Sequence, residues 1–272
     1  MPYQRILTIQ DISCVGQCSM TVALPIMSAC GHEVCILPAA VLSTHTGGFG
    51  KPAVVKLGDF MEDAVSHWKE NGITFDLVYV GYLGSLDAVK IAEQVMDTMV
   101  APGGVTVVDP ALADHGKFYS GLSEEYAQAM FRLCRRADVM LPNITEAAMM
   151  AGLPYREQPD KDYVQKLLEL LPGNHVLLTG VGFNPEETGF ALRTGENVLY
   201  HTHPKLSKSY SGTGDIFASA FCGVLASGKD YGEAGRIAAQ FTLRCIEKTA
   251  ADPAHWYGVK FETALPDLIR MI

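Results

Sequence analysis

The chain has 272 residues, of which 48% are hydrophobic and 19% charged, and its 30 acidic and 21 basic residues give a net charge of −9 at pH 7. Such a balance, without a lysine-arginine cluster, excludes the basic face that nucleic-acid binding needs, and no apolar run reaches the roughly 18 residues of a membrane-spanning helix. The N-terminus has no signal-peptide pattern, and the seven cysteines lack a CxxC pair or zinc-ligand spacing. We expect a cytoplasmic globular protein with reduced cysteines and neither nucleic acid nor membrane as partner.

Short β-rich runs alternate with longer helical patterns along the chain, which is typical of a mostly parallel sheet covered by helices. The predicted strands are residues 6–10, 33–39, 77–81, 105–109, 138–141 and 175–179. The predicted helices are residues 19–29, 59–71, 85–100, 124–136, 145–151, 161–171, 213–227, 232–248 and 261–272.

Two further stretches, residues 188–193 and 197–203, alternate in polarity around Thr194-Gly195-Glu196 and predict an antiparallel hairpin at one edge of the sheet. Residues 38–56 form the longest stretch without clear periodicity, and long irregular loops in compact domains are often lids or binding loops. We therefore expect an α/β fold of three layers, with a mostly parallel central sheet, helices on both faces and an edge hairpin. The sequence has no repeat or linker, which predicts one domain over residues 1–272.

Polar residues follow the predicted strands at their carboxyl ends, where ligands bind in sheets of this kind. They are Asp11, Tyr82, Asp109, Asp114, Asn143, Glu146 and Thr179. Asp109 and Asp114 belong to VVDPALAD, and Asn143 and Glu146 to LPNITEAAMMAG. Carboxylate and amide oxygens suit Mg²⁺, which usually keeps several waters and bridges to phosphates. The alternative is that Asn143 caps the following helix and Glu146 completes a capping box.

Gly212-Thr213-Gly214-Asp215 precedes the helix-forming, apolar run IFASAFCGVLA. The two glycines let the backbone approach an anion, and a helix that begins there points unpaired N–H groups and its positive dipole end at phosphate oxygens. Asp215 then needs a reason to lie beside an anion. It is either an ordinary acid in the first helical turn or a base that takes a hydroxyl proton.

The other common nucleotide motifs are missing, since the sequence has no Walker A motif and no GxGxxG opening a helix after the first strand. SGTGDIFASAF instead resembles the signature of the ribokinase-like superfamily. DPALAD, NITEA, ILTIQD, AAVLSTHTGGFG and VGYLGS resemble segments of its pyridoxal kinase branch. The resemblance spans nearly the whole chain.

This resemblance implies an ATP- and Mg²⁺-dependent kinase that phosphorylates the hydroxymethyl group of pyridoxal, pyridoxine or pyridoxamine, with a monovalent cation as a further candidate cofactor. Gly212, Thr213 and Gly214 would form the anion hole and Asp215 would accept the substrate proton. Asp109, Asp114 and Glu146 would hold Mg²⁺, largely through water. The nucleotide phosphates would meet the residues at two strand ends: Asn143, Thr179 and Gly180. The resemblance also implies a homodimer.

Around the acceptor ring, the resemblance implies Asp11, Val41, His45 and Tyr82. His45 could instead be a plain loop histidine, and Tyr82 could serve packing. Asp11 stands where pyridoxal kinases typically carry Ser, and it could pair with a protonated pyridine nitrogen. Because related kinases also place an acid near this strand end, a hydroxymethylpyrimidine or sugar-like alcohol kinase stays open. A third alternative is a non-catalytic vitamer-binding protein, for which a damaged GTGD segment or missing metal carboxylates would be expected.

Overall fold

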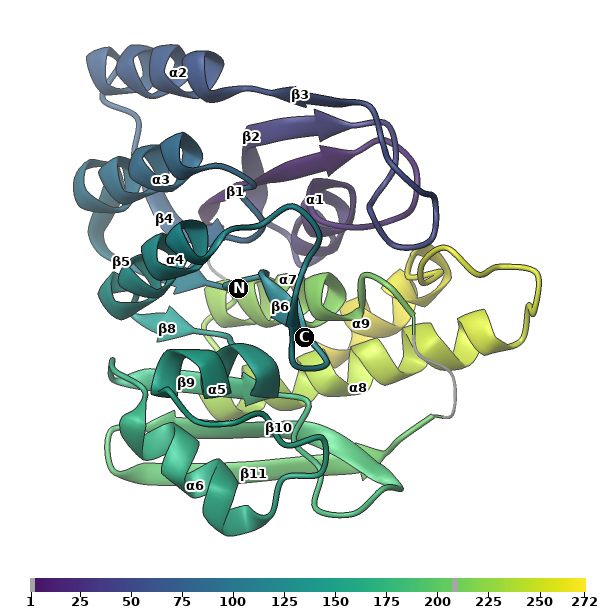
Figure 1. Ribbon diagram of the computed structural model, residues 1–272. Coiled ribbons are helices and arrows are strands. Elements are labelled where there is room, and N and C mark those ends of the chain that lie inside the picture. Colours follow the sequence, from purple (N-terminus) through teal and green to yellow (C-terminus); the bar gives the residue numbers. More distant parts are fainter. Residues whose placement is uncertain (1–2, 207–209) are drawn as a thin grey trace. The chain divides into compact units, whose positions relative to one another are not determined.

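The computed structural model describes residues 3–206 and 210–272 (Figure 1). The chain divides into two compact units, which we describe separately. Unit 1 comprises Met1–Thr106 and Lys208–Ile272, and unit 2 comprises Val107–Ser207. Strand β5 (Val100–Val108) crosses the boundary, so that its first seven residues belong to unit 1 and its last two to unit 2. The single domain expected from the sequence stays a prediction.

Unit 1 contains four complete strands in the order β4-β1-β2-β3. They are β1 (Arg5–Ser13), β2 (Glu33–Leu42), β3 (Val54–Lys56) and β4 (Phe75–Val80). Strand β1 pairs in parallel with both β2 and β4, whereas β3 is an antiparallel edge strand. Six consecutive residues of β1, from Ile6 to Asp11, are buried. Alternate residues of a strand point to opposite faces, so both faces of this strand are covered.

The helices of unit 1 come from both ends of the chain. They are α1 (Met20–Ala29), α2 (Gly58–Glu70), α3 (Leu86–Thr98), α7 (Thr213–Ala226), α8 (Tyr231–Ala250), the 3₁₀ helix η1 (Glu262–Ala264) and α9 (Leu265–Met271). Helix α1 packs on β1, β2 and α7, while α2 packs on β2 and α3. Helix α7 also contacts β4 and α8, and every residue from Ile216 to Val224 is buried. A helix that is apolar all round is a core helix, which fixes where its N-terminus lies.

Unit 2 continues from the end of β5 with the strand order β5-β8-β9-β10-β11. Its strands are β8 (Val139–Met140), β9 (His175–Thr179), β10 (Glu187–Thr194) and β11 (Asn197–Pro204), and its helices are α4 (Glu124–Arg136), α5 (Ile144–Ala151) and α6 (Lys161–Leu170). The pairs β5–β8 and β8–β9 are parallel, and β9–β10 and β10–β11 are antiparallel. A separate two-stranded ribbon pairs β6 (Ala113–Asp114) with β7 (Lys117–Phe118).

The structure confirms the alternation of strands and helices and the edge hairpin expected from the sequence. Several details differ. Strands β1 and β2 each continue three residues beyond the expected ends, and the edge strand β3 occupies the end of the expected irregular stretch, which therefore shrinks to residues 43–53. The last predicted helix is divided into η1 and α9, because Pro266 lacks the N–H that a continuous helix would need.

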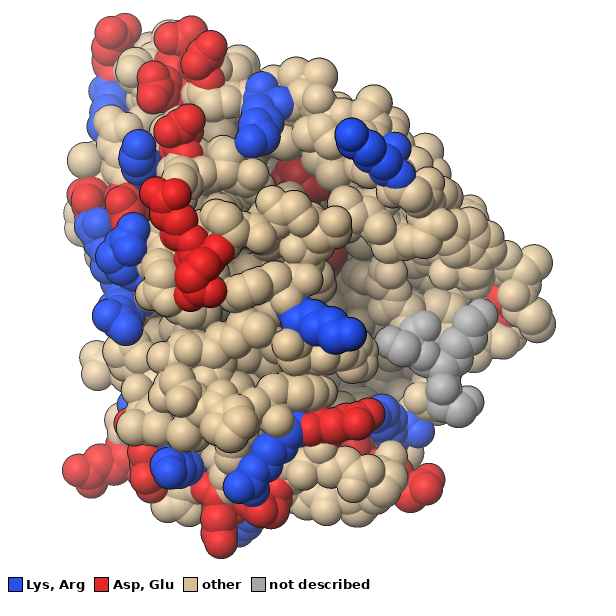
Figure 2. Space-filling model, viewed as in Figure 1, with Lys and Arg blue, Asp and Glu red and all other residues tan. Residues whose placement is uncertain are grey.

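On the face drawn in Figure 2, both acidic and basic side chains are present. On the face drawn in Figure 2, acidic groups gather over α2, whose exposed residues include Asp59, Glu62, Asp63 and Glu70. Basic and acidic groups are interspersed around α6. In the part of the chain that the structure describes, no helix combines the length and the apolar character needed to cross a bilayer.

Candidate active site

The GTGD segment opens α7 in unit 1. Gly212 occupies the N-cap position with a φ of 84°, a left-handed conformation that favours glycine, and no side chain among the described residues caps it. A Cβ atom at this position would lie 2.5 Å from the carbonyl oxygen of Gln17. Lys208 and Ser209, which precede the segment in the sequence, lie outside the described residues. Within the described part of the chain, the terminus of α7 therefore lacks the side-chain cap that an ordinary helix start would have.

Asp215 lies in the first turn of this helix, yet its carboxylate is not used as a cap. The backbone N–H of Ser19 is near this carboxylate and lowers its pKa. Burial and the nearby charge of Asp11 raise the pKa of Asp215 to about 6, and this N–H limits that rise. A carboxylate with a pKa just below neutral pH is ionised at pH 7 and can still take up a proton, as a general base requires.

Asp11 is the second carboxylate of this region. It lies within β1, at the point where the register with β2 shifts between Gln10 and Ile12, and only 2% of its surface is exposed. Its Oδ2 accepts a hydrogen bond of 2.9 Å from the Ser13 hydroxyl, and the nearby Ser19 hydroxyl also lowers the pKa of this carboxylate. Burial nevertheless raises the pKa of Asp11. Such an irregularity in a ladder often re-aims a side chain beside an active site.

Tyr82 and Val41 lie on the two strands beside β1. Tyr82 follows β4, and its carbonyl oxygen accepts a 3.1 Å bond from the Asp11 N–H. The pKa of the Tyr82 phenol is raised by burial and by the charge of Asp11. Val41 lies opposite Ile12 in β2 and is partly exposed. The structure thus gathers Asp11, Tyr82, Val41 and Asp215 into one region of unit 1.

His45 is buried, with 5% of its surface exposed, and both ring nitrogens are engaged with backbone. Its Nε2 lies 2.7 Å from the Tyr257 carbonyl oxygen, and its Nδ1 accepts a 3.0 Å bond from the Gly47 N–H. These partners require the neutral tautomer that carries its proton on Nε2. His45 therefore fastens residues 43–53 to the C-terminal loop, and a polar contact to a substrate through its nitrogens would have to replace one of these bonds.

Three aromatic rings add to this connection between residues 43–53 and the C-terminal loop. Phe49 lies against His45 and against Trp256 and Tyr257, with ring centroids 4.8 to 5.8 Å apart. Gly16 lies beneath the His45 ring, because a Cβ atom at Gly16 would overlap His45 Cδ2. The sequence suggested none of these contacts, since Trp256 and His45 are more than 200 residues apart.

Sequence reasoning missed Ser13 and Ser19, because a single hydroxyl in a loop carries no motif. It noted Cys18 only as a candidate buried side chain. Cys18 is partly buried near both carboxylates, and burial together with those charges raises the pKa of its thiol well above the usual value. A reactive thiolate does not form in such surroundings. All seven cysteines are free, in agreement with the reduced cysteines expected from the sequence, and Cys14 is exposed.

In unit 2, Asn143 and Glu146 form a complete capping box at the start of α5. The Asn143 side chain accepts from the Glu146 N–H at 3.0 Å, and Glu146 Oε2 accepts from the Asn143 N–H at 3.0 Å. Glu146 Oε1 also accepts from the N–H groups of Leu112 and Ala113, at 2.8 and 3.3 Å. The capping alternative left open by the sequence is thus present in the structure.

The three expected metal ligands belong to unit 2 but do not form a direct metal cage. Among the described residues, no group of three His, Cys, Asp or Glu side chains is arranged to hold a metal ion. Glu146 is buried, Asp114 is exposed, and Asp109 accepts from the Ala111 N–H at 3.1 Å. Burial and the charge of Asp114 raise the pKa of Glu146. This acidic set fits a cation that keeps its own water ligands, as Mg²⁺ commonly does.

Thr179 and Gly180 lie beside this set at the end of β9. The Thr179 N–H donates to the Pro142 carbonyl oxygen at 2.9 Å, and Thr179 forms a parallel bridge with Asn143. Gly180 is exposed and adopts a φ of 75°, which turns the chain out of the strand. The structure therefore brings Asn143, Thr179 and Gly180 together at one strand end of unit 2.

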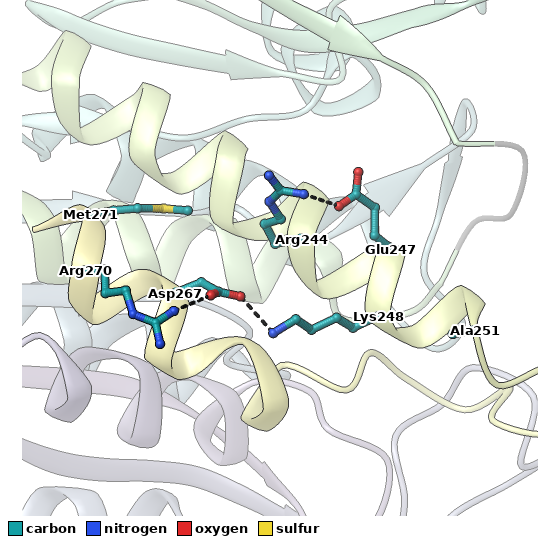
Figure 3. Close-up of a pocket in the computed structure, with 7 residues that line it drawn as sticks. All are labelled: Arg244, Glu247, Lys248, Ala251, Asp267, Arg270 and Met271. Atoms are coloured by element: carbon teal, nitrogen blue, oxygen red, sulfur yellow. Dashed lines mark hydrogen bonds and ion pairs between the residues drawn. The ribbon is translucent and has the colours of Figure 1, made fainter.

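A separate surface pocket lies between α8 and α9 in unit 1 (Figure 3). Its charged side chains pair with one another: Arg244 with Glu247 at 2.9 Å, and Asp267 with Lys248 at 2.7 Å and with Arg270 at 2.9 Å. None of the residues expected at the active site lines it. Only the pair Lys248–Asp267 joins α9 to α8, whereas the other two pairs each lie within one helix.

Comparison with known proteins identifies relatives of this chain. Residues 59–259 match the phosphomethylpyrimidine kinase family. The crystal structure of pyridoxal kinase from Lactobacillus plantarum superposes with a TM-score of 0.90 and 32% identity, over 99% of this chain and 98% of that one. A putative phosphomethylpyrimidine kinase from Bacteroides thetaiotaomicron, in a crystal form with pyridoxal, gives a TM-score of 0.91 and 32% identity over 98% and 96% of the two chains.

A curated relative adds sequence evidence. The pyridoxine/pyridoxal/pyridoxamine kinase of Bordetella bronchiseptica is 25% identical over 256 residues, which cover 90% of this chain and 89% of the relative. The mostly parallel sheet with helices around it is the fold of the pyridoxal kinase structures. These matches confirm the predicted fold class and a phosphotransferase with an alcohol acceptor. The chain belongs to the phosphomethylpyrimidine kinase family, on the pyridoxal kinase branch of the ribokinase-like superfamily.

Proposed function

We propose that this protein transfers the γ-phosphoryl group of ATP to the hydroxymethyl group of pyridoxal, pyridoxine or pyridoxamine. The observation that carries the proposal is Asp215, a carboxylate with a pKa near 6 at the uncapped start of α7, beside buried Asp11. The similarity to pyridoxal kinase from Lactobacillus plantarum supports the choice of acceptor.

In this proposal Asp215 takes the proton of the substrate hydroxyl as it attacks. The N–H groups of Thr213 and Gly214 have no partner within the helix and point from its positive end, so they would receive the transferred phosphoryl group. Phosphoryl transfer passes through a loose transition state, in which positioning and charge neutralisation count for more than base strength. A base with a pKa near 6 suits such a step.

The cation and the nucleotide would be held by unit 2. Asp109, Asp114 and Glu146 would hold Mg²⁺ through its water ligands, and Asn143, Thr179 and Gly180 would contact the nucleotide phosphates. Bound Mg²⁺ would neutralise phosphate charge. An anionic phosphate repels a carboxylate, so this neutralisation would favour transfer to a hydroxyl that Asp215 deprotonates. A monovalent cation is a further candidate cofactor.

On the acceptor side, Asp11, Tyr82, Val41 and His45 would surround the ring. Asp11 is buried and ionisable, so it would pair with a protonated pyridine nitrogen or accept from a ring hydroxyl. Family membership keeps hydroxymethylpyrimidine as the alternative acceptor. A non-catalytic vitamer-binding protein has less support, because the GTGD segment and the acidic residues of unit 2 are all present.

The acceptor is tested by turnover of the purified protein with ATP and Mg²⁺ on pyridoxal, pyridoxine, pyridoxamine and hydroxymethylpyrimidine in parallel. We expect kcat/KM to be highest for one of the three vitamers. A preference for hydroxymethylpyrimidine would move the protein to the alternative, and vitamer binding by calorimetry without ATP turnover would indicate a binding protein.

The catalytic base is tested by Asp215→Asn, which keeps the size of the side chain and removes its basicity. We expect kcat to fall by about 10²- to 10⁴-fold, the usual contribution of general base catalysis, with nucleotide affinity retained. Full activity in this variant would contradict the role. A homodimer in the cytoplasm completes the proposal, and sedimentation at micromolar concentration would detect the dimer.

A further inference from the structure

A short ribbon in unit 2 carries Asp114, one of the acids that we assign to the cation. Strands β6 and β7 pair with Asp114 opposite Lys117, so that the two residues His115-Gly116 form the turn between them. Both turn residues have positive φ, 49° and 75°, as a type I′ hairpin turn requires. The chain therefore reverses its direction directly after Asp114.

The carboxylate of Asp114 is bonded to this turn. Its Oδ1 accepts a hydrogen bond of 2.8 Å from the His115 N–H, and 55% of the side chain is exposed. Its Oδ2 lies 3.7 Å from Nε2 of the exposed His115 ring, and an exposed pair at this distance contributes little. The direction of the carboxylate therefore depends mainly on the backbone of the turn.

The turn is held in its place by Thr145. The Gly116 N–H donates to Thr145 Oγ1 at 3.1 Å. Thr145 is the second residue of α5, and only 1% of its surface is exposed. Burial of a hydroxyl costs free energy unless the hydroxyl is hydrogen-bonded, and valine would fill the same space without needing a partner. The threonine thus supplies an acceptor that the ribbon turn uses.

The residue before Asp114 is fixed by the neighbours of Thr145. The Ala113 carbonyl oxygen accepts from Asn143 Nδ2 at 2.7 Å, and the Ala113 N–H donates to Glu146 Oε1 at 3.3 Å. The backbone on both sides of Asp114 is therefore bonded to the first turn of one helix, while the carboxylate stays exposed.

Tyr155 restricts the same turn from the loop after α5. A Cβ atom on Gly116 would lie 2.9 Å from Tyr155 Cδ1, so the backbone of the turn closely approaches this ring. Gly116 is only partly exposed. The bond between Gly116 and Thr145 is therefore made in packed surroundings and not at a free loop tip.

We propose that Thr145 is a positioning residue for cation binding in the proposed kinase reaction. Its hydroxyl holds the His115-Gly116 turn and, through the His115 N–H, sets the direction in which Asp114 meets the water ligands of Mg²⁺. Residues that orient the ligands of a metal commonly affect metal affinity although they do not touch the metal. The inference rests on the proposed function, because it takes Asp114 as one of the residues that hold the cation.

The test uses Thr145→Val in the full-length protein, because valine has the shape of threonine and lacks the acceptor. ADP binding is measured by calorimetry with and without Mg²⁺, and turnover on pyridoxal is measured against Mg²⁺ concentration. We expect the affinity for ADP with Mg²⁺ and the apparent affinity for Mg²⁺ to fall about tenfold, the smallest loss typical when a ligand-orienting residue is removed. The affinity for ADP without Mg²⁺ and the KM for pyridoxal should not change. An equal loss of ADP affinity with and without Mg²⁺, or no loss at all, would overturn the proposal.

Two further variants separate positioning from stability. Thr145→Ser keeps the hydroxyl and should keep the wild-type response to Mg²⁺. Thr249→Val is the matched control, because the fully buried Thr249 on α8 of unit 1 also accepts from a loop backbone, the Lys260 N–H at 2.8 Å. Both valine variants should lower Tm by about 2–4 °C, the shift expected for one lost hydrogen bond in a chain of about this size. Only Thr145→Val should change the response to Mg²⁺. An equal change in Thr249→Val, or a serine variant that behaves like valine, would contradict the role of the Thr145 hydroxyl.

Asp114→Asn distinguishes failure of this inference from failure of the proposed function. If Asp114→Asn left the response to Mg²⁺ unchanged, the assignment of the cation to Asp114 would fail, and the role of Thr145 would fail with it. If Asp114→Asn weakened the response while Thr145→Val did not, the role of Thr145 alone would fail.

Discussion

Two helix N-termini of this protein carry an acid in their first turn and use it differently. At α5, Glu146 completes a capping box and accepts three backbone hydrogen bonds. At α7, the N-cap is Gly212, which has no side chain, and Asp215 lies near the backbone N–H of Ser19 at the start of another helix. The acid of α5 stabilises its own turn. The acid of α7 lies beside a second acid, and the first N–H groups of its turn have no acceptor within the helix.

This difference explains why similar sequence patterns call for different interpretations. An acid three residues after the N-cap is an ordinary cap when the N-cap residue has a side chain that returns the bond, as Asn143 does. It is a candidate for chemistry when that residue is glycine and the acid is buried near another acid. Four sets of substitutions can break or sharpen the contrast.

Glu146→Ala should have the largest effect on stability. It leaves the N–H groups of Leu112, Ala113 and Asn143 without their shared acceptor inside unit 2. Since a buried donor without a partner costs about 1–3 kcal/mol, we expect the free energy of unfolding to fall by roughly 4 kcal/mol, measured by urea titration. Glu146→Gln keeps one acceptor oxygen and should lose less. If Glu146→Ala left the free energy of unfolding unchanged, the capping box of α5 would not stabilise the fold, and the contrast with α7 would fail.

Asp215→Asn should instead raise the free energy of unfolding at neutral and higher pH. The pKa of Asp215 is about 6 in the folded protein against an ordinary 3.8, so the folded state holds the proton more tightly than the unfolded chain does. The stability that this proton provides is complete below pH 3.8 and is lost as the pH rises through 6. The asparagine variant avoids that loss.

We therefore expect Asp215→Asn to raise the free energy of unfolding by roughly 2 kcal/mol at pH 8, from the linkage of about 1.4 kcal/mol per pKa unit discounted for partial exposure. The gain should shrink toward zero by about pH 4, near the ordinary pKa of an aspartate. Denaturant titrations of both proteins across this range would check it. A variant that is less stable than the wild type at pH 8 would mean that Asp215 is a structural acid like Glu146.

Gly212→Ala tests the packing that leaves α7 without a side-chain cap. Its φ of 84° and the Gln17 carbonyl oxygen both oppose a Cβ atom. We expect a loss of roughly 1–2 kcal/mol in the free energy of unfolding, together with a fall in kcat. Gly228→Ala is the control, because Gly228 has a φ of 90° but none of the described atoms lies within 4 Å of the position that a Cβ would take. Because of backbone strain, Gly228→Ala should lower the free energy of unfolding by a similar amount, and it should leave kcat unchanged.

The sequence predicted the fold well because the elements of this chain have clear periodicity and clear ends. The strand 175–179 and the helix 124–136 agree with β9 and α4 to the residue. It failed at β3, since three exposed residues form a strand only because β2 offers an edge. Periodicity within a segment cannot reveal a strand that exists through its neighbour.

The candidate site was predictable only in part, for a similar reason. Asp11, Asp215 and Tyr82 could be named because strand ends and a glycine-rich turn mark them in the sequence. Ser19 could not, because its left-handed backbone and its position near Asp215, almost 200 residues further along the chain, leave no pattern in the sequence. The nitrogens of His45 could not be assigned either, since Tyr257 lies 212 residues further along the chain.

The smallest effect is expected at ordinary caps, which supply the baseline for the comparison. Ser123 accepts from the Tyr126 N–H at 3.2 Å at the start of α4, and Ser85 accepts from the Ala88 N–H at 3.2 Å at the start of α3. Ser123→Ala and Ser85→Ala should each lower the free energy of unfolding by about 1 kcal/mol and leave kcat unchanged. Because one cap lies in each unit, a loss of activity in either variant would mean that helix stability alone limits turnover. The loss of activity expected for Gly212→Ala would then give no evidence of a catalytic role. If kcat is unchanged in both Ser123→Ala and Ser85→Ala, the uncapped turn of α7 is the feature that catalysis requires.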